Sequence, residues 1–220
     1  MKPDDIAHYL SEHPDFFQQR PELLGVLDIP HPQNGQAISL VERQSLILRE
    51  RVRALEARLA ELIRHGEEND VILDKLVHWV RAMLVQPEPA QLPATLVTGL
   101  KSTFAVPFAA VRLWDVRDEY VTLDFARPVD PDAIRLAASM AAPFCGSNVG
   151  FDAAGWMSAD PAMIKSLAML PLRVGLGTDA FGMLVLGSPD KDRFQITMGT
   201  AFLARIAELA SAALARLRKV

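Results

Sequence analysis

The sequence predicts an α+β domain preceded by a long helix and a short helical cap. Apolar residues recur every seven positions between Val41 and Met83, which indicates one long helix. Beyond residue 87, segments with a helical period of 3.6 residues alternate with segments with a strand period of two. Antiparallel hairpins flanked by helices indicate a single sheet. The predicted divisions are a cap over 1–39, a helix with a coiled-coil seam over 40–86, and a domain over 87–220.

Composition indicates one globular domain with a helical extension. Of the 220 residues, 50% are hydrophobic and 23% are charged. A net charge of -4 gives no broad attraction to nucleic acid or to anionic lipid. The opening MKPDDIAHYL lacks the pattern of a secretory signal, and no uncharged run approaches the roughly 18 apolar residues of a membrane span. We therefore expect a cytoplasmic protein with no direct nucleic-acid partner and no membrane contact.

The first 39 residues contain two similar segments, Pro14 to Phe17 and Pro21 to Leu24. Each places proline at a first helical position, an acidic residue next and an apolar pair behind it. They predict two short helical turns. The segment from Ile29 to Gly35 consists of turn-forming residues and separates this cap from the next element.

The long helix carries an apolar seam that predicts a homodimer. Arg51 and Glu56 flank this seam at g and e positions, five residues apart, which is the spacing of an interchain pair in a parallel dimer. A helix over 41–83 would be about 65 Å long, too long for one small domain to cover. The alternative is a helix that folds back on its own chain, for example on the cap. The expected dimerisation residues are Leu48, Val52, Leu55, Leu59 and Leu62.

Gly66 and Asn69 interrupt the seam. Beyond them the apolar face becomes wider than a two-helix seam requires. The helix is therefore expected to begin packing on a globular domain there. The residues that widen the face are Ile72, Val77, Trp79 and Leu84.

The last 134 residues predict alternating helices and strands. Helices are expected over 92–104, 133–140 and 197–217, and irregular structure over 143–156. Strands are expected over 108–114, 120–125, 166–173 and 181–187, with a hairpin at 115–118 joining the first two. The last helix is expected to bury a stripe made of Phe202, Ile206, Leu209, Ala213 and Leu217.

The segment from Ser166 to Leu172, a glycine-containing hairpin, and "FGMLVLGS" from Phe181 to Ser188 resemble the closing half of a GAF domain. With "HPDFF", "IPHP", "SLVERQ" and "PFCG", the whole chain is similar to the bacterial domain of unknown function family 484. This resemblance implies a GAF-like fold behind a helical N-terminus and brings no established activity. It also implies a protein partner, such as a site-specific tyrosine recombinase, because members are often encoded beside one.

In GAF-like folds a ligand sits between one face of the sheet and an irregular segment that crosses it. By position, the resemblance implies a ligand pocket lined by Phe144, Cys145 and Trp156, with Arg112 as an anion partner. The alternatives are that the aromatic residues fill the core, as they more often do in such a segment, and that Arg112 is a solvated strand residue. Cys145 is the single cysteine and is expected to be a buried packing thiol.

The placement of histidines argues against catalysis in the last domain. All five lie before residue 87: His8, His13, His31, His65 and His78. The domain therefore has no histidine to pair with a nucleophilic serine or cysteine and no histidine for haem or a metal. Asp190 and Asp192 lack the further oxygen ligands of a calcium loop. "GSPDKDRF" is better explained as a strand-ending turn, with Phe194 packing on the last helix.

These observations favour a non-enzymatic, dimeric regulatory or scaffolding protein with no catalytic or metal residues and an unknown cofactor. Such a protein would couple the pocket named above, and an unidentified small molecule bound there, to a partner through its coiled coil. The main alternative is a redox or small-molecule sensor that acts through Cys145 and this pocket. A catalyst is a third alternative, which the missing histidines disfavour.

Overall fold

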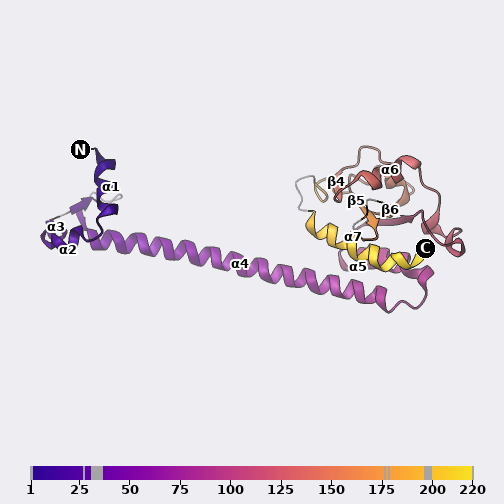
Figure 1. Cartoon of the computed structure of the whole chain (residues 1–220), viewed down its shortest axis with the longest axis horizontal. Coiled ribbons are helices and arrows are strands. Elements are labelled where there is room, and N and C mark those ends of the chain that lie inside the picture. The colour runs from indigo at the N-terminus through magenta and orange to yellow at the C-terminus, as the bar shows by residue number, and fades with distance from the viewer. Residues whose placement is uncertain are drawn as a thin grey trace. The chain divides into compact units, whose positions relative to one another are not determined.

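The computed structural model describes residues 2–26, 28–30, 37–175, 177, 179–195 and 200–219 (Figure 1). The chain divides into two compact units, Met1–Asn69 and Asp70–Val220. The division falls inside the long helix α4 (Leu40–Leu84). Among the described residues, no helix combines the length and apolar character that a membrane span requires.

The N-terminal unit begins with three short helices and a two-stranded antiparallel sheet. The Asp5 carboxylate accepts a hydrogen bond from the Lys2 backbone N–H at 2.9 Å, which caps the first helix. Its Tyr9 ring stacks on His13 and meets Phe16 edge-on. The elements are α1 (Pro3–Glu12), α2 (Phe16–Gln19), α3 (Pro21–Val26), β1 (Asp28–Pro30) and β2 (Ala37–Ser39).

The sequence analysis predicted only part of this unit correctly. The helical start at Pro21 is confirmed, whereas the other predicted turn begins at Phe16 instead of Pro14. The predicted turn over 29–35 is wrong at its first two residues, because Ile29 and Pro30 belong to β1. Residues 31–36 lie outside the described part of the chain.

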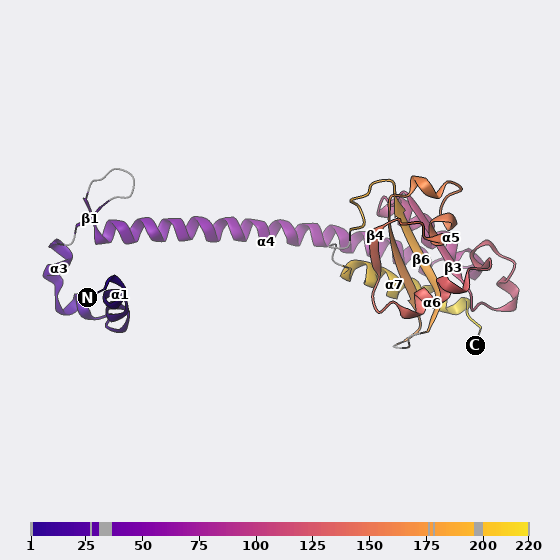
Figure 2. The same ribbon diagram turned by 90° about the horizontal axis from the view of Figure 1, so that it is seen from above.

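Helix α4 is continuous over 45 residues (Figure 2). Leu76, Trp79 and Met83 are buried in the C-terminal unit, so the predicted packing on a globular domain beyond Asn69 is confirmed. The indole N–H of Trp79 donates to the Leu96 carbonyl oxygen at 3.1 Å. Of the other residues expected to widen this face, Ile72, Val77 and Leu84 remain exposed.

The C-terminal unit contains a four-stranded antiparallel sheet in the order β3-β6-β5-β4. This sheet, together with its helices, confirms the predicted α+β class. The strands are β3 (Phe108–Leu113), β4 (Phe144–Ser147), β5 (Ser166–Arg173) and β6 (Ala180–Ser188), and the helices are α5 (Leu92–Thr103), α6 (Pro131–Ser139) and α7 (Ala201–Leu214).

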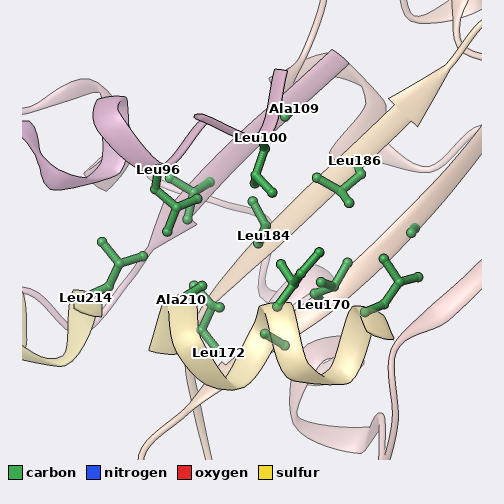
Figure 3. Packing of buried hydrophobic residues seen from close by; sticks show 14 of the residues in the cluster. Leu96, Leu100, Ala109, Leu170, Leu172, Leu184, Leu186, Ala210 and Leu214 are labelled. Atoms are coloured by element: carbon green, nitrogen blue, oxygen red, sulfur yellow. The ribbon is translucent and has the colours of Figure 1, made fainter. Parts of the chain in front are cut away.

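Two apolar layers form because alternate residues of a strand face opposite sides of the sheet. One layer joins the sheet to α5, α7 and the end of α4, and Figure 3 shows Leu96 and Leu100 of α5 pointing toward Leu184 and Leu186 of β6. The other layer joins the opposite face to α6 and the 3-10 turn Asp152–Trp156. The register pairs Leu170 with Leu184 in the centre of the sheet.

Three local predictions are wrong. The segment 120–125 is not a strand, because Tyr120, Leu123 and Ala126 each donate a backbone hydrogen bond three residues back, which winds the chain into 3-10 turns. The segment 143–156 is not wholly irregular, since it contains β4. The buried stripe of the last helix is displaced: Ile206 and Leu217 are buried as predicted, whereas Phe202, Leu209 and Ala213 are partly buried.

The end of the chain also differs from the expected helix over 197–217. Helix α7 ends at Leu214 and a 3-10 turn covers Ala215–Leu217. Residues 196–199 lie outside the described part of the chain. The buried residues of this segment are Leu203, Ile206, Ala207, Ala210, Ser211, Leu214 and Leu217.

Candidate functional site

The apolar seam of α4 is a candidate protein–protein interface. Its five central residues are between 51% and 67% exposed, so no described part of the chain covers them. A contiguous exposed apolar surface marks an interaction site in a soluble protein. The described residues therefore do not show the helix folding back on its own chain. The seam consists of Leu48, Val52, Leu55, Leu59 and Leu62.

Charged residues flank this seam. Arg51 and Glu56 are exposed at g and e positions, where a partner helix would pass. On the same helix, Arg64 Nη1 lies 3.0 Å from Glu68 Oε1 one turn further along. Such exposed pairs within one helix contribute little to stability. In coiled coils, charges at e and g positions set the choice and orientation of the partner helix.

The structure does not bring the four predicted pocket residues together. Phe144 and Trp156 pack in the layer beside α6, whereas Cys145 faces the opposite layer beside α5 and α7. Phe144 meets Phe151 edge-on, with ring centroids 5.6 Å apart. Arg112 lies on β3, and β6 and β5 separate β3 from β4. Phe144 and Trp156 therefore contribute to packing, and Arg112 stands at the other edge of the sheet.

Arg112 lines a hollow of about 330 Å³ beside the start of α5. Its Nη1 donates to the Asp124 carbonyl oxygen at 2.7 Å. Burial lowers the pKa of the Arg112 guanidinium and the nearby Arg127 lowers it further, while the Asp124 carboxylate, which forms an ion pair with Arg127, opposes them. An arginine retains its charge near neutral pH, so the lining of this hollow combines a cation, the Asp124 carboxylate and apolar side chains.

Cys145 is buried in the main core, where it pairs in register with Ala168 of β5. Burial raises the pKa of its thiol. The thiolate is the reactive form of cysteine, and reactive cysteines are generally exposed and have a lowered pKa. These surroundings agree with the predicted packing role.

The folded protein should therefore react slowly with a thiol reagent at neutral pH. We expect the labelling rate of Cys145 to rise steeply in denaturant, because unfolding exposes the thiol and removes the burial that raises its pKa. The rate can be followed by absorbance with and without denaturant. Labelling of the native protein as fast as that of the unfolded chain would contradict the packing role.

The turn after β6 is held by hydrogen bonds among its own residues and by hydrogen bonds to Ser166, the first residue of β5. Asp190 N donates to Ser188 Oγ at 3.1 Å, and Asp192 N donates to Asp190 Oδ1 at 2.9 Å. Ser166 Oγ donates to the Asp190 carbonyl oxygen at 2.6 Å and accepts from Phe194 N at 3.3 Å, and Phe194 is buried. The structure thus contains the predicted strand-ending turn. Sequence reasoning missed these two buried serines, although Ser166 begins one long apolar run and Ser188 follows another.

Charged groups of the described residues also lie together near the C-terminus, where ion pairs join Arg218 to Asp115 and Lys219 to Asp118. No three His, Cys, Asp or Glu side chains in the described part of the chain are grouped as around a metal ion. The four described histidines, His8, His13, His65 and His78, are exposed, and His31 lies outside the described residues. The arrangement that remains as the main candidate site is the seam of α4.

The protein is of the α+β class. Its domain with an antiparallel sheet follows a helical N-terminal unit and a long helix with an exposed seam. The chain belongs to the family described as "Protein of unknown function, DUF484", whose profile matches residues 1–219. A 73-residue stretch is 29% identical to "Uncharacterized protein YigA" of Salmonella typhimurium (strain LT2) and covers 33% of this chain. The chain spans only 31% of the length of that relative.

Solved structures similar to this chain include three GAF domains. One, from a putative sensor histidine kinase of Pseudomonas syringae pv. tomato, is 18% identical over 70% of this chain and 91% of that chain, with a TM-score of 0.45. Another, from an Acinetobacter phosphoenolpyruvate-protein phosphotransferase, is 11% identical over 66% and 92%, with a TM-score of 0.46. The A. aeolicus nlh2 GAF domain is 11% identical over 67% and 98%, with a TM-score of 0.49. At these sequence identities and TM-scores, the similarity does not assign a ligand or an activity to this chain.

Proposed function

We propose that this protein is a non-enzymatic, homodimeric scaffolding or regulatory protein whose two copies pair through α4. The exposed seam from Leu48 to Leu62 is the observation that supports this function. Apolar side chains at a and d positions favour pairing with a second helix, since burying them removes apolar surface from water. A second copy of the chain carries the same seam in the same register.

The flanking charges favour a parallel pair. In a parallel, in-register dimer Arg51 of one copy faces Glu56 of the other, because g positions meet the following e position. An antiparallel pair brings g positions together and e positions together, which would set Arg51 near Arg58 as well as Arg49 near Glu56, so it gains an attraction but also incurs a repulsion. Opposite charges across the pair stabilise it, and like charges destabilise it. A parallel dimer also places two C-terminal units at the same end of the pair, where they can present one surface twice to a protein partner.

The surroundings of Cys145 do not support the alternative role as a redox sensor. A sensing thiol must reach its oxidant and ionise readily. Cys145 is buried and its pKa is raised, so both requirements are opposed. Binding of a small anion at Arg112 is compatible with the scaffolding role and would add regulation to it.

Cysteine cross-linking tests the dimer and its orientation. In a Cys145→Ala background, Leu48→Cys should give a disulfide-linked dimer on mild oxidation, because equivalent d positions of a parallel pair lie close enough for the bond. The matched control is Glu50→Cys, an exposed f position on the outer side of the same turn. Non-reducing gels give the yield. Equal yields from the two variants would contradict the parallel seam.

A further inference from the structure

The part of α4 within the C-terminal unit has two apolar faces. Leu76, Trp79 and Met83 form the first face and are buried within the unit. Leu73, Val77 and Leu84 form the second face and are 53%, 58% and 70% exposed. A helix that is apolar on more than one face is normally buried on each of them. In the described part of the chain, however, no other residues bury the second face.

The second face borders a groove between α4 and α7. This groove has a volume of about 540 Å³, and apolar side chains make up most of its lining. Arg81 and Arg205 also line it, and their long stems can lie along apolar surface while their charged ends stay in water. The remaining lining residues are Leu76, Val77, Val80, Leu84 and Leu209.

Leu73 and Val80 keep the a positions of the original heptad, whereas Val77 and Leu84 each lie one residue after a d position. In the unbroken heptad the d positions after Leu62 would be Asn69, Leu76 and Met83, but Leu76 and Met83 pack inside their own unit. A four-residue step after Gly66, of the kind called a stutter, changes which residues of the helix form the seam. It then passes through the exposed Leu73, Val77 and Leu84 and the partly buried Val80, and these four positions are four, three and four residues apart in chain order.

We propose that this groove is a second dimer contact, which receives the Leu73–Leu84 stretch of a second copy of the chain. The inference rests on the proposed parallel dimer, because an in-register partner bound along Leu48–Leu62 has its own Leu73–Leu84 stretch at the same level of the helix. The contact is isologous: Val77 of each copy meets Val77 of the other. Leu209 of α7 flanks this contact, so the dimer interface includes residues of the C-terminal unit as well as the coil.

This contact gives the C-terminal unit a direct connection to the dimer. Leu209 lies on α7, whose Leu214 packs in the same core as Leu170 and Leu184 of the sheet. A change in the position of α7 would therefore alter both the groove and the packing on the sheet. The same geometry allows a ligand or partner bound to the C-terminal unit to alter how tightly two copies hold together.

Cross-linking in the full chain tests the groove. In the Cys145→Ala background, Val77→Cys should form an interchain disulfide about tenfold or more faster than Lys75→Cys, because thiols held in contact have an effective concentration in the millimolar range. Lys75 is exposed on the same helix, two residues away and on the other side from Val77. Both substitutions are at exposed positions, so the fold should tolerate them.

The Leu48→Cys variant separates the two proposals. Fast cross-linking at both Leu48→Cys and Val77→Cys supports the continuous interface. Fast cross-linking at Leu48→Cys, with Val77→Cys no faster than Lys75→Cys, overturns the groove contact and leaves the coiled-coil dimer standing. Slow cross-linking at both positions overturns both proposals.

Discussion

Replacing Leu55 and Leu59 together with glutamate is expected to convert the dimer into single chains. These side chains occupy neighbouring d and a positions of the seam and are exposed in one chain. In the dimer, each substitution would place a carboxylate in an apolar contact, where an unpaired charge is strongly disfavoured. Light scattering should show the mass fall from about twice 24.2 kDa to one chain of 24.2 kDa.

The matched control for this variant is Ala57→Glu with Ala60→Glu. These residues are exposed at f and b positions, on the outer side of the same helix. The control adds the same charge and should leave the dimer intact. Dissociation of the control to the same extent would mean that added charge, and not loss of the seam, separates the chains.

Replacing Trp79 with alanine is expected to destabilise the C-terminal unit by about 3–5 kcal/mol, the range for removing a fully buried aromatic side chain. Trp79 is 1% exposed, donates to Leu96 and meets the Phe104 ring edge-on at 6.2 Å. Its indole also lies against Gly99, where an added Cβ would come within 2.5 Å of Trp79 Cδ1. The substitution would therefore leave a large cavity between α4 and α5.

Denaturant unfolding monitored by circular dichroism measures this loss of stability. The neighbouring His78→Ala provides the control, since His78 is exposed and surface substitutions usually change stability by about 0.5 kcal/mol or less. A Trp79→Ala variant as stable as His78→Ala would show that the end of α4 is not anchored in the C-terminal unit.

The sequence predicted the seam well because its signal is local and periodic. Leu48, Val52, Leu55, Leu59 and Leu62 follow one heptad, and a helix with this pattern leaves them on one side wherever the rest of the chain lies. The strands β5 and β6 were predicted for a similar reason, since each is a long apolar run bounded by turn residues.

The predictions failed where distant contacts decide the structure. Residues 120–125 resemble a strand in composition, but local turns and the hydrogen bond from Arg112 to the Asp124 carbonyl oxygen hold this segment at the edge of the sheet. Likewise, Phe144 and Cys145 were assigned to one pocket, although adjacent residues of a strand face opposite sides of a sheet. That alternation could have separated them if β4 had been recognised.

The groove beside α7 could be predicted only in part. The sequence showed that Val77 and Leu84 widen the apolar face of α4. It did not show which side of that face packs within the chain, because the answer depends on α5 and α7, which follow later in the sequence. Arg205 and Leu209 reach the groove only through the tertiary fold.

The molar mass of the wild-type protein tests the central proposal most directly. Light scattering on the full chain at high micromolar concentration should give twice the mass of one chain, 24.2 kDa, and dilution should shift the mass toward a single chain as the pair dissociates. A mass of 24.2 kDa that does not change across this concentration range would contradict the proposal that two copies pair through α4.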